Sequence, residues 1–312
     1  MNKHLIISLV CTAVLVAGTA CSNRNTPEET SAKKRTITIT EQGDPASLPN
    51  ASAPDILRIA KATITEETNT LSASWTAGDL LTYCNLSSSD PINNTIYTGS
   101  LTAASTAVTA QLTGEVNCIN GDYLAVVYPA TTFTSNTAYT ISLTGQDGTL
   151  ATLATSYHYL YSCAYVTSVT DNTATATMPK MKSLLTVCKF SFKDKETSTI
   201  IPINTLAISY GGSGSDSNTY PQSASVAITI SENTAQNDIH AVGVTGSSPL
   251  TITCPSAQSE VYVALLPTPS GERTYNFTVT TPSAATYSGT ARATLHEGEY
   301  VVATELKLTK TK

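Results

Sequence analysis

Apolar and polar residues alternate with a period of two along most of the chain. This pattern places the apolar side chains of a segment on one face of an extended strand, with the other face exposed to water. The clearest alternating segments are residues 36–40, 139–144, 225–230 and 274–279. Two more segments, 123–128 and 261–266, are apolar throughout, which indicates strands that are buried on both faces.

The last alternating segment lies near the C-terminus, within residues 300–308. Glu305 and Lys307 occupy one face of this predicted strand. The opposite face is expected to consist of Val302, Thr304, Leu306 and Leu308. Because that face is mainly apolar, we expect it to be buried against the rest of the fold.

The pattern predicts an all-β chain. No apolar stripe with a period of 3.6 residues extends beyond about two helical turns. Short strands with one wet face, separated by turn residues such as Asn120-Gly121-Asp122, are typical of antiparallel β-sandwiches. A chain of 312 residues fits two domains better than one. We therefore expect two tandem antiparallel β-sandwich domains, at residues 36–178 and 179–312.

The first 20 residues resemble a bacterial export signal. A short polar start is followed by the apolar stretch Leu5 to Ala17 and then by small residues. A transmembrane helix needs about 20 apolar residues, so this stretch is too short to span a bilayer. We expect residues 1–20 to be a signal peptide.

Cys21 directly follows these small residues, as in a lipobox, where the cysteine is diacylated and becomes the mature N-terminus. The sequence departs from the usual lipobox at Gly18, where Leu is common. Two or more acyl chains hold a protein stably on a membrane. Cys21 therefore predicts a lipid (palmitate) anchor in the outer membrane, with the polar residues 21–35 as a flexible tether. A secreted protein without lipid is the alternative.

Composition narrows the classes of partner. Charged residues make up only 13% of the chain, the net charge is −6 and the isoelectric point is near 5.2. A nucleic-acid partner reached through a basic surface is not expected for such a chain. The abundant Thr fits the wet faces of strands, because this β-branched residue has a polar hydroxyl and carries no charge.

The sequence contains no motif that predicts an enzyme. The mature chain has three histidines, His158, His240 and His296, and none has the spacing of a metal site. The Gly-Ser-rich stretch 211–218 lacks the pattern of a nucleophile turn and indicates a surface loop. We predict no catalytic residue, no metal and no cofactor.

Five cysteines remain after Cys11 in the signal and Cys21 are set aside. They are Cys84, Cys118, Cys163, Cys188 and Cys254. Their number is odd, and their spacings fit no CxxC zinc pattern. We expect most of them to be small buried side chains inside strands, and a Cys84–Cys118 bridge stays open.

Three further segments carry a family resemblance. The first runs from Ser74 to Leu81 and contains Trp75, Gly78 and Asp79. The second is 121–130, a strand that ends in Tyr-Pro, and the third is 178–192, in which Lys180 or Lys182 stands where a His is frequent. Together with the lipobox cysteine, and in this order, they resemble the fimbrillin family of Bacteroidales, the FimA/Mfa-like lipoprotein pilins. The resemblance covers essentially the whole mature chain.

The resemblance implies a fold and a function. Members of the family have two β-sandwich domains with transthyretin-like topology and are exported as lipoproteins. An Arg-specific protease removes the N-terminal segment with the first strand, and a strand from another subunit fills the vacated groove by β-augmentation. The resemblance thus implies a structural subunit of a surface fimbria that supports cell adhesion. Its partners would be other fimbrial subunits in a homo- or hetero-polymer, the outer membrane through the lipid, and an unidentified receptor.

On this chain, the first strand would be residues 36–40. Burial of Ile37 and Ile39 is expected to stabilise the fold by roughly 1.5–3 kcal/mol each. We favour Arg58 as the processing site, because cleavage there removes the lipid, the tether and the first strand together. Arg35 is the alternative, although a cut there leaves the first strand attached. The simpler interpretation of either Arg is a solvent-exposed charge.

The C-terminal strand 300–308 is the candidate donor strand, with Leu306 and Leu308 as the side chains that fill the groove. The alternative is that it is an ordinary closing strand of the second domain. A second function class is a monomeric surface lipoprotein that binds a glycan or a host protein. Such a protein would present an exposed aromatic surface, for which Tyr157, Tyr159 and Tyr161 are the candidates.

Overall fold

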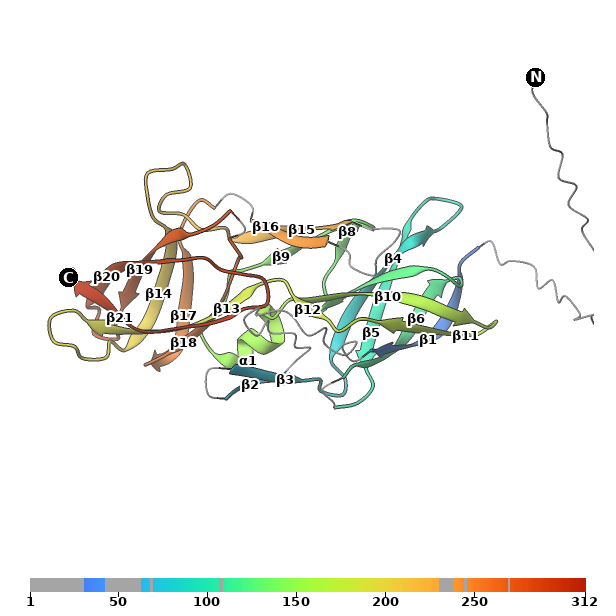
Figure 1. Cartoon of the computed structure of the whole chain (residues 1–312), viewed down its shortest axis with the longest axis horizontal. Helices are drawn as coiled ribbons and strands as arrows, with labels where there is room; N and C mark the ends of the chain where they lie inside the picture. Colours follow the sequence, from blue (N-terminus) through green and yellow to red (C-terminus); the bar gives the residue numbers. More distant parts are fainter. Residues whose placement is uncertain are drawn as a thin grey trace, which may run out of the picture. The chain divides into compact units, whose positions relative to one another are not determined.

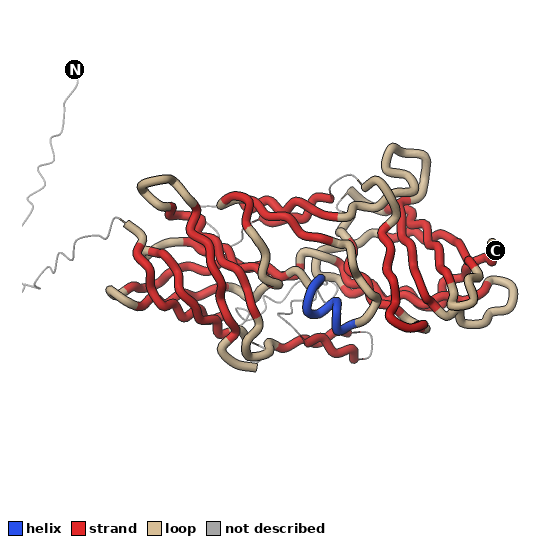
Figure 2. Tube along the Cα trace, turned by 180° about the vertical axis from the view of Figure 1, so that it is seen from behind, coloured by secondary structure: helices blue, strands red, loops and turns tan. Residues whose placement is uncertain are grey.

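The computed structural model describes residues 31–42, 63–67, 70–106, 109–229, 238–243, 246–268 and 270–312. Within these ranges the chain is built from strands, and helical structure is limited to α1 (Leu150–Thr152) and the π-helical turn η1 (Leu153–Tyr157) (Figures 1 and 2). The all-β fold predicted from the alternation is confirmed. The predicted signal peptide, Cys21 and Arg58 lie outside the described residues.

The N-terminal sheet closes on itself. Its eight strands run in the order β11-β1-β6-β5-β4-β7-β10-β12, and β10 also pairs with β11, so seven strands form a continuous hydrogen-bonded ring. The β1–β11 pair is parallel and the other pairs are antiparallel. The strands are β1 (Lys33–Glu41), β4 (Leu80–Ser89), β5 (Ile96–Ala103), β6 (Gln111–Cys118), β7 (Tyr123–Tyr128), β10 (Leu160–Val169), β11 (Thr173–Met178) and β12 (Lys182–Ser183).

The C-terminal sheet is open. Its order is β17-β14-β19-β20-β21-β13-β18, and the β13–β21 pair is parallel whereas the other pairs are antiparallel. Each of the two large sheets thus contains one parallel pair, which the alternation pattern does not reveal. The strands are β13 (Thr186–Asp194), β14 (Ile203–Tyr210), β17 (Leu250–Gln258), β18 (Val261–Leu265), β19 (Arg273–Thr280), β20 (Thr286–Ala293) and β21 (Tyr300–Lys310).

Two smaller sheets complete the described fold. A four-stranded sheet in the order β16-β15-β9-β8 joins strands from both halves of the sequence, because β9 pairs with β15. A two-stranded hairpin consists of β2 and β3. The strands are β2 (Thr63–Glu67), β3 (Thr70–Ser74), β8 (Phe133–Ser135), β9 (Ala138–Ser142), β15 (Ser223–Thr229) and β16 (Asp238–Gly243). The division into domains at residue 178 stays a prediction.

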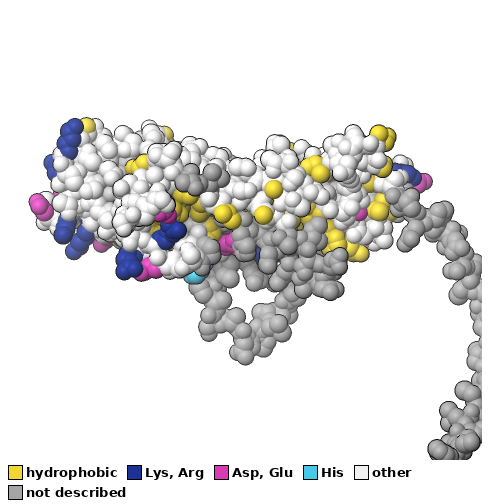
Figure 3. All heavy atoms as spheres, turned by 90° about the horizontal axis from the view of Figure 1, so that it is seen from above, with side chains coloured by type: hydrophobic (Ala, Val, Ile, Leu, Met, Phe, Trp, Pro, Cys, Tyr) yellow, Lys and Arg dark blue, Asp and Glu magenta, His cyan; other side chains and the backbone are white. Residues whose placement is uncertain are grey.

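Two clusters of buried side chains form the core. One lies inside the closed ring and includes Ile37, Ile39 and Trp75. The other combines inward side chains of the C-terminal sheet, the four-stranded sheet and the β2–β3 hairpin. The segments predicted to be buried on both faces behave accordingly, since β7 is buried from its second residue onward and only Tyr262 in β18 is partly exposed. Much of the visible surface is neither apolar nor charged (Figure 3).

All five described cysteines are buried, and each lies in a strand. The expectation that they act as small buried side chains is confirmed. Cys84 carries no disulfide, so the Cys84–Cys118 bridge that the sequence left open is not formed. The two residues belong to different core clusters.

The C-terminal strand β21 differs from its predicted phase. Its register against β13 shifts between Phe190 and Phe192, so that Thr304 and Glu305 together oppose one residue of β13. Glu305 has a φ of 60°, which is the left-handed conformation seen at bulges. The prediction that Val302 and Thr304 share the buried face of Leu306 and Leu308 is therefore wrong, because the bulge reverses the alternation and leaves Val302 exposed.

Candidate functional site

The candidate site is the position of β1 within the closed ring. β1 is hydrogen-bonded on both sides, in parallel with β11 and antiparallel with β6. Ile37 lies between Gly114 of β6 and Ala174 of β11. Ile39 lies between Leu112 of β6 and Ala176 of β11. Both Ile side chains are 0% exposed. The strand predicted at 36–40 is thus present, and it is an interior strand of the ring.

Arg35 binds main-chain carbonyls at the beginning of β1. Its side chain is 2% exposed, so the interpretation of Arg35 as a solvent-exposed charge is wrong. The Nε atom donates to the carbonyl oxygen of Thr170 at 2.6 Å, and Nη1 donates to the carbonyl of Cys118. A protease needs its target Arg in an accessible, extended segment, so cleavage after Arg35 requires β1 to leave the ring first.

At the end of β1, Glu41 accepts hydrogen bonds from main-chain amides, whereas Arg35 at the beginning donates to main-chain carbonyls. Its carboxylate is buried and accepts hydrogen bonds from the amide of Ala110 at 2.6 Å and from the amide of Met181 at 2.9 Å. Charge-assisted bonds of this kind to backbone N–H groups are stronger than neutral ones. Positions 35, 37, 39 and 41 therefore all point inward, with a donor at one end, two apolar side chains in the middle and an acceptor at the other end.

The Trp75-x-x-Gly78-Asp79 segment forms a turn at the edge of the same ring. Trp75 is 0% exposed and meets Tyr128 edge-to-face, with ring centroids 5.5 Å apart. Gly78 has a φ of 94°, which favours glycine. Asp79 closes the turn, because its Oδ2 accepts from the amide of Thr76 at 2.8 Å. These three residues have structural positions in the N-terminal core and its turn.

Leu306 and Leu308 lie in β21 of the C-terminal sheet. Leu308 is 1% exposed and packs over Gly289 of β20, whereas Leu306 is partly buried. In this structure β21 is an interior strand of its own C-terminal sheet, paired with β20 and β13, and the chain does not bring Leu306 or Leu308 to the β1 position. Their role as donor side chains stays a prediction.

One cluster was missed by the sequence analysis. Glu66 of β2 accepts hydrogen bonds from the hydroxyls of Tyr262 and Tyr300, both at 2.6 Å, and from Lys189 Nζ at 3.0 Å. Lys189 also pairs with Glu260 at 2.9 Å. The cluster ties the β2–β3 hairpin to β13, β18 and β21. The three residues that bind Glu66 lie between 123 and 234 residues from it in sequence, so no local pattern predicts the cluster.

The geometry of this cluster sets the charge of its members. Partial burial acts to raise the pKa of Glu66, but the hydrogen bonds from Tyr262, Tyr300 and Lys189 outweigh it and hold that pKa below its ordinary value. Burial acts to lower the pKa of Lys189, but the bonds to Glu260 and Glu66 outweigh it, so the pKa of Lys189 lies above its ordinary value. Both side chains are charged at neutral pH, and the ion pair stabilises the docked hairpin.

The aromatic surface expected for a binding lipoprotein is not exposed. Tyr157, Tyr159 and Tyr161 are 8%, 8% and 5% exposed and belong to the buried core. The Tyr157 hydroxyl donates to the carbonyl of Thr144 at 2.6 Å, and the Tyr159 hydroxyl to that of Ser142 at 3.2 Å. These three Tyr side chains therefore pack in the core and form no exposed aromatic surface.

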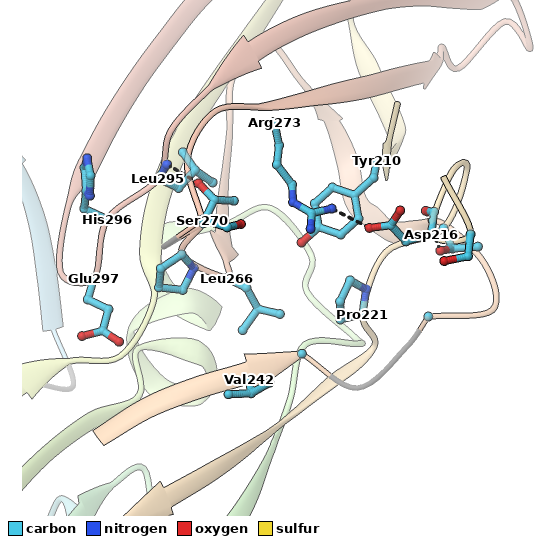
Figure 4. A pocket seen from close by; sticks show the side chains of 16 residues that line it. Tyr210, Asp216, Pro221, Val242, Leu266, Ser270, Arg273, Leu295, His296 and Glu297 are labelled. Carbon is cyan, nitrogen blue, oxygen red and sulfur yellow. Dashed lines mark hydrogen bonds and ion pairs between the residues drawn. The ribbon is translucent and has the colours of Figure 1, made fainter. Parts of the chain in front are cut away.

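A pocket of about 690 Å³ lies among loops at the C-terminal sheet (Figure 4). Its cation, Arg273, is already paired with Asp216 at 2.5 Å and lies 4.5 Å over the ring of Tyr210. The remaining lining mixes apolar side chains such as Leu266 with polar ones. In the described part of the chain, no group of three His, Cys, Asp or Glu side chains could hold a metal ion.

Across the described ranges, no helix has the length and apolar character needed to cross a membrane. No protein-family model matches the chain. No curated protein matches it either.

Several solved structures are similar to this chain at low scores. One is a Bacteroides fragilis NCTC 9343 protein assigned provisionally to cell adhesion, with a TM-score of 0.42, 12% identity and coverage of 87% of this chain and 92% of that one. Another is the shaft pilin SpaA of Lactobacillus rhamnosus GG, with a TM-score of 0.33, 11% identity and coverage of 90% and 98%. A minor pilin of Streptococcus agalactiae has a TM-score of 0.27, 11% identity and coverage of 89% and 97%. Likeness at this level does not assign the chain to a family.

Proposed function

We propose that this chain is a structural subunit of a bacterial surface fimbria that polymerises by strand exchange and supports cell adhesion. The observation that carries the proposal is the position of β1. It is paired on both sides and contributes two fully buried Ile side chains to the core of the ring. Its removal would leave an apolar slot between two unpaired strand edges, and such edges associate readily with a strand from another chain.

The proposed sequence of events begins with export as a fimbrillin-like lipoprotein anchored at Cys21 in the outer membrane. A protease then cuts after Arg58, which removes the lipid, the tether and β1 in one step. The C-terminal strand of another subunit, with Leu306 and Leu308, fills the slot. The partners are therefore other subunits, in a homo- or hetero-polymer, and the mature location is the cell surface. The proposal involves no enzymatic step by this chain and no cofactor.

The burial of Arg35 supports Arg58 as the processing site. Arg35 belongs to the ring and binds carbonyls of β6 and of the turn before β11, whereas Arg58 follows β1 by 17 residues, counted from Glu41. A cut within or before β1 would leave the strand in place. Only a cut after β1 separates the strand from the rest of the chain.

The test uses the chain from Ser22 onward with a trace of an Arg-specific protease, because trypsin would also cut after Lys61, three residues past Arg58. It compares Arg58→Ala with the matched control Arg292→Ala, which removes an exposed Arg of β20. We expect the parent and the control to give one early cut after Arg58 and a heat-sensitive ladder on an unboiled gel. Arg58→Ala should abolish both. A ladder that persists in Arg58→Ala, or a cut after Arg58 that never yields polymer, would contradict the proposal.

A further inference from the structure

The two ends of the β1 slot differ in chemistry. At the Arg35 end, the carbonyl oxygens of Thr170 and Cys118 point at the side chain of β1 and accept its hydrogen bonds. At the Glu41 end, the amides of Ala110 and Met181 point inward and donate to the carboxylate. Without β1 these groups would lose their partners, and buried polar groups without partners are costly. An occupant of the slot therefore needs a donor at one end and an acceptor at the other.

The C-terminal strand has such a pattern once it is straight. In its own sheet the bulge at Glu305 separates Thr304 from the face of Leu306 and Leu308. A strand without the bulge alternates with a period of two, so Thr304, Leu306, Leu308 and Lys310 would share one face. This set matches the length and spacing of positions 35, 37, 39 and 41. The other face is unsuitable, because Glu305 and Lys307 would fall in the apolar middle of the slot.

The direction of insertion decides whether the ends match. If the incoming strand runs in the direction of β1, Thr304 lies at the carbonyl end and the ammonium of Lys310 faces the amides of Ala110 and Met181. An ammonium has no acceptor, so those amides stay unsatisfied. If the strand runs in the reverse direction, Lys310 donates to the carbonyls of Thr170 and Cys118. The hydroxyl of Thr304 then accepts at the amide end, directly or through a bridging water.

We propose that residues 304–310 of a second copy enter the slot in the direction opposite to that of β1, with Lys310 in the place of Arg35 and Thr304 in the place of Glu41. This inference rests on the proposed function, because it needs the slot to be vacated. It adds the register and the orientation of the incoming strand. The incoming strand would run antiparallel to β11 and parallel to β6, the reverse of the pairing that β1 makes.

Charge substitutions at the two ends of the incoming strand test its orientation, because the two directions predict opposite changes in the dissociation rate of the polymer. Thr304→Glu restores a carboxylate at the amide end of the reversed strand, so it should slow dissociation of the polymer at least about tenfold, as expected for hydrogen bonds to a charged group. Lys310→Glu would point a carboxylate at the carbonyls and should speed dissociation by a similar factor. If the strand ran in the direction of β1, Thr304→Glu would weaken the polymer and Lys310→Glu would strengthen it.

The control is Lys307→Glu, which changes the same charge on the opposite face of the strand. Thr304, Lys307 and Lys310 are all exposed in the single chain, so none of the variants should alter its folding. The measurement is the dissociation rate, in SDS at fixed temperature, of the polymer matured with the Arg-specific protease, read from unboiled gels. A weaker polymer for Thr304→Glu, or equal effects of Lys310→Glu and Lys307→Glu, would overturn the reversed orientation. If the matured parent chain itself forms no polymer, the proposed function fails and this inference fails with it.

Discussion

At the scale of single residues, the inner face of β1 carries two charged side chains among its four buried ones. A period-two pattern identifies Ile37 and Ile39 because they are apolar, but it places Arg35 in the tether and leaves Glu41 outside the predicted strand 36–40. Both are buried because each finds backbone partners from distant segments, Arg35 from a carbonyl 135 residues away and Glu41 from an amide 140 residues away. A buried charge is tolerated when such bonds satisfy it.

The first prediction concerns Glu41. Glu41→Gln keeps the shape of the side chain but replaces one acceptor oxygen by an NH₂ group, which would face the amide of Ala110 or of Met181. We expect a loss of about 1.5–3 kcal/mol in the free energy of unfolding, the usual worth of a buried hydrogen bond to a charged group. Urea unfolding of the chain from Ser22 onward at pH 7 measures it. The control Glu115→Gln removes an exposed pair with Lys34 and should cost less than about 1 kcal/mol.

The second prediction concerns the middle of the slot. Ile39→Ala removes a fully buried side chain and leaves a cavity beside Leu112 and Ala176, so it should lower the free energy of unfolding by about 2–5 kcal/mol. Thr40→Ala, at the neighbouring exposed position, should change it by less than about 0.5 kcal/mol. The same urea titration checks both. Equal losses in the two variants would mean that β1 is not an interior strand.

At the scale of elements, the sequence predicts where strands lie better than how they pair. The segments 36–40, 123–128, 139–144 and 274–279 all contain the expected strands, because alternation is a local property. Pairings are not local, so the parallel β1–β11 contact that helps to close the ring could not be predicted. The bulge in β21 depends on one residue, Glu305, whose left-handed φ shifts the phase. Neither the ring nor the Glu66 cluster could therefore be predicted from the pattern.

The third prediction belongs to the β2–β3 hairpin and its Glu66. Because the folded chain holds the pKa of Glu66 below its unfolded value, the stability that this carboxylate provides is fully present above about pH 5. It is lost as the pH falls through the lowered pKa. The parent chain should therefore lose more stability between about pH 6 and pH 3 than Glu66→Gln does. Asp147 and Asp216 also have lowered pKa values, so the parent-minus-variant difference isolates Glu66.

Thermal unfolding at a series of pH values gives this comparison directly. At pH 7 Glu66→Gln should be the less stable chain, because Lys189 and the hydroxyls of Tyr262 and Tyr300 lose a charged acceptor. The two curves should converge as the pH falls, because the carboxylate of the parent becomes protonated below its lowered pKa. Parallel curves across the whole range would show that the hairpin does not depend on the charge of Glu66.

At the scale of the whole molecule, the proposed removal of β1 affects the two large sheets differently. The ring depends on β1 for closure, since β1 is the strand that lies between β11 and β6. The C-terminal sheet contains no residue from the segment that the proposed cut removes, because its first strand begins at Thr186. Loss of β1 should consequently open the N-terminal ring and leave the C-terminal sheet intact. The cleaved chain would then carry an open slot and still be folded.

Hydrogen exchange provides the fourth prediction and tests that separation. Immediately after cleavage and at low protein concentration, amides of β6 and β11 that faced β1 should exchange at least about tenfold faster than in the uncut chain, because they become strand edges. Amides of β14 and β19, in the middle of the C-terminal sheet, should keep their protection. Protection of β6 and β11 should return in the polymer, where an incoming strand takes the place of β1.

Equal loss of protection in both sheets would mean that the cut unfolds the chain as a whole. Unchanged protection of β6 and β11 would mean that the cleaved strand stays seated, and that release of β1, rather than its cleavage, controls assembly.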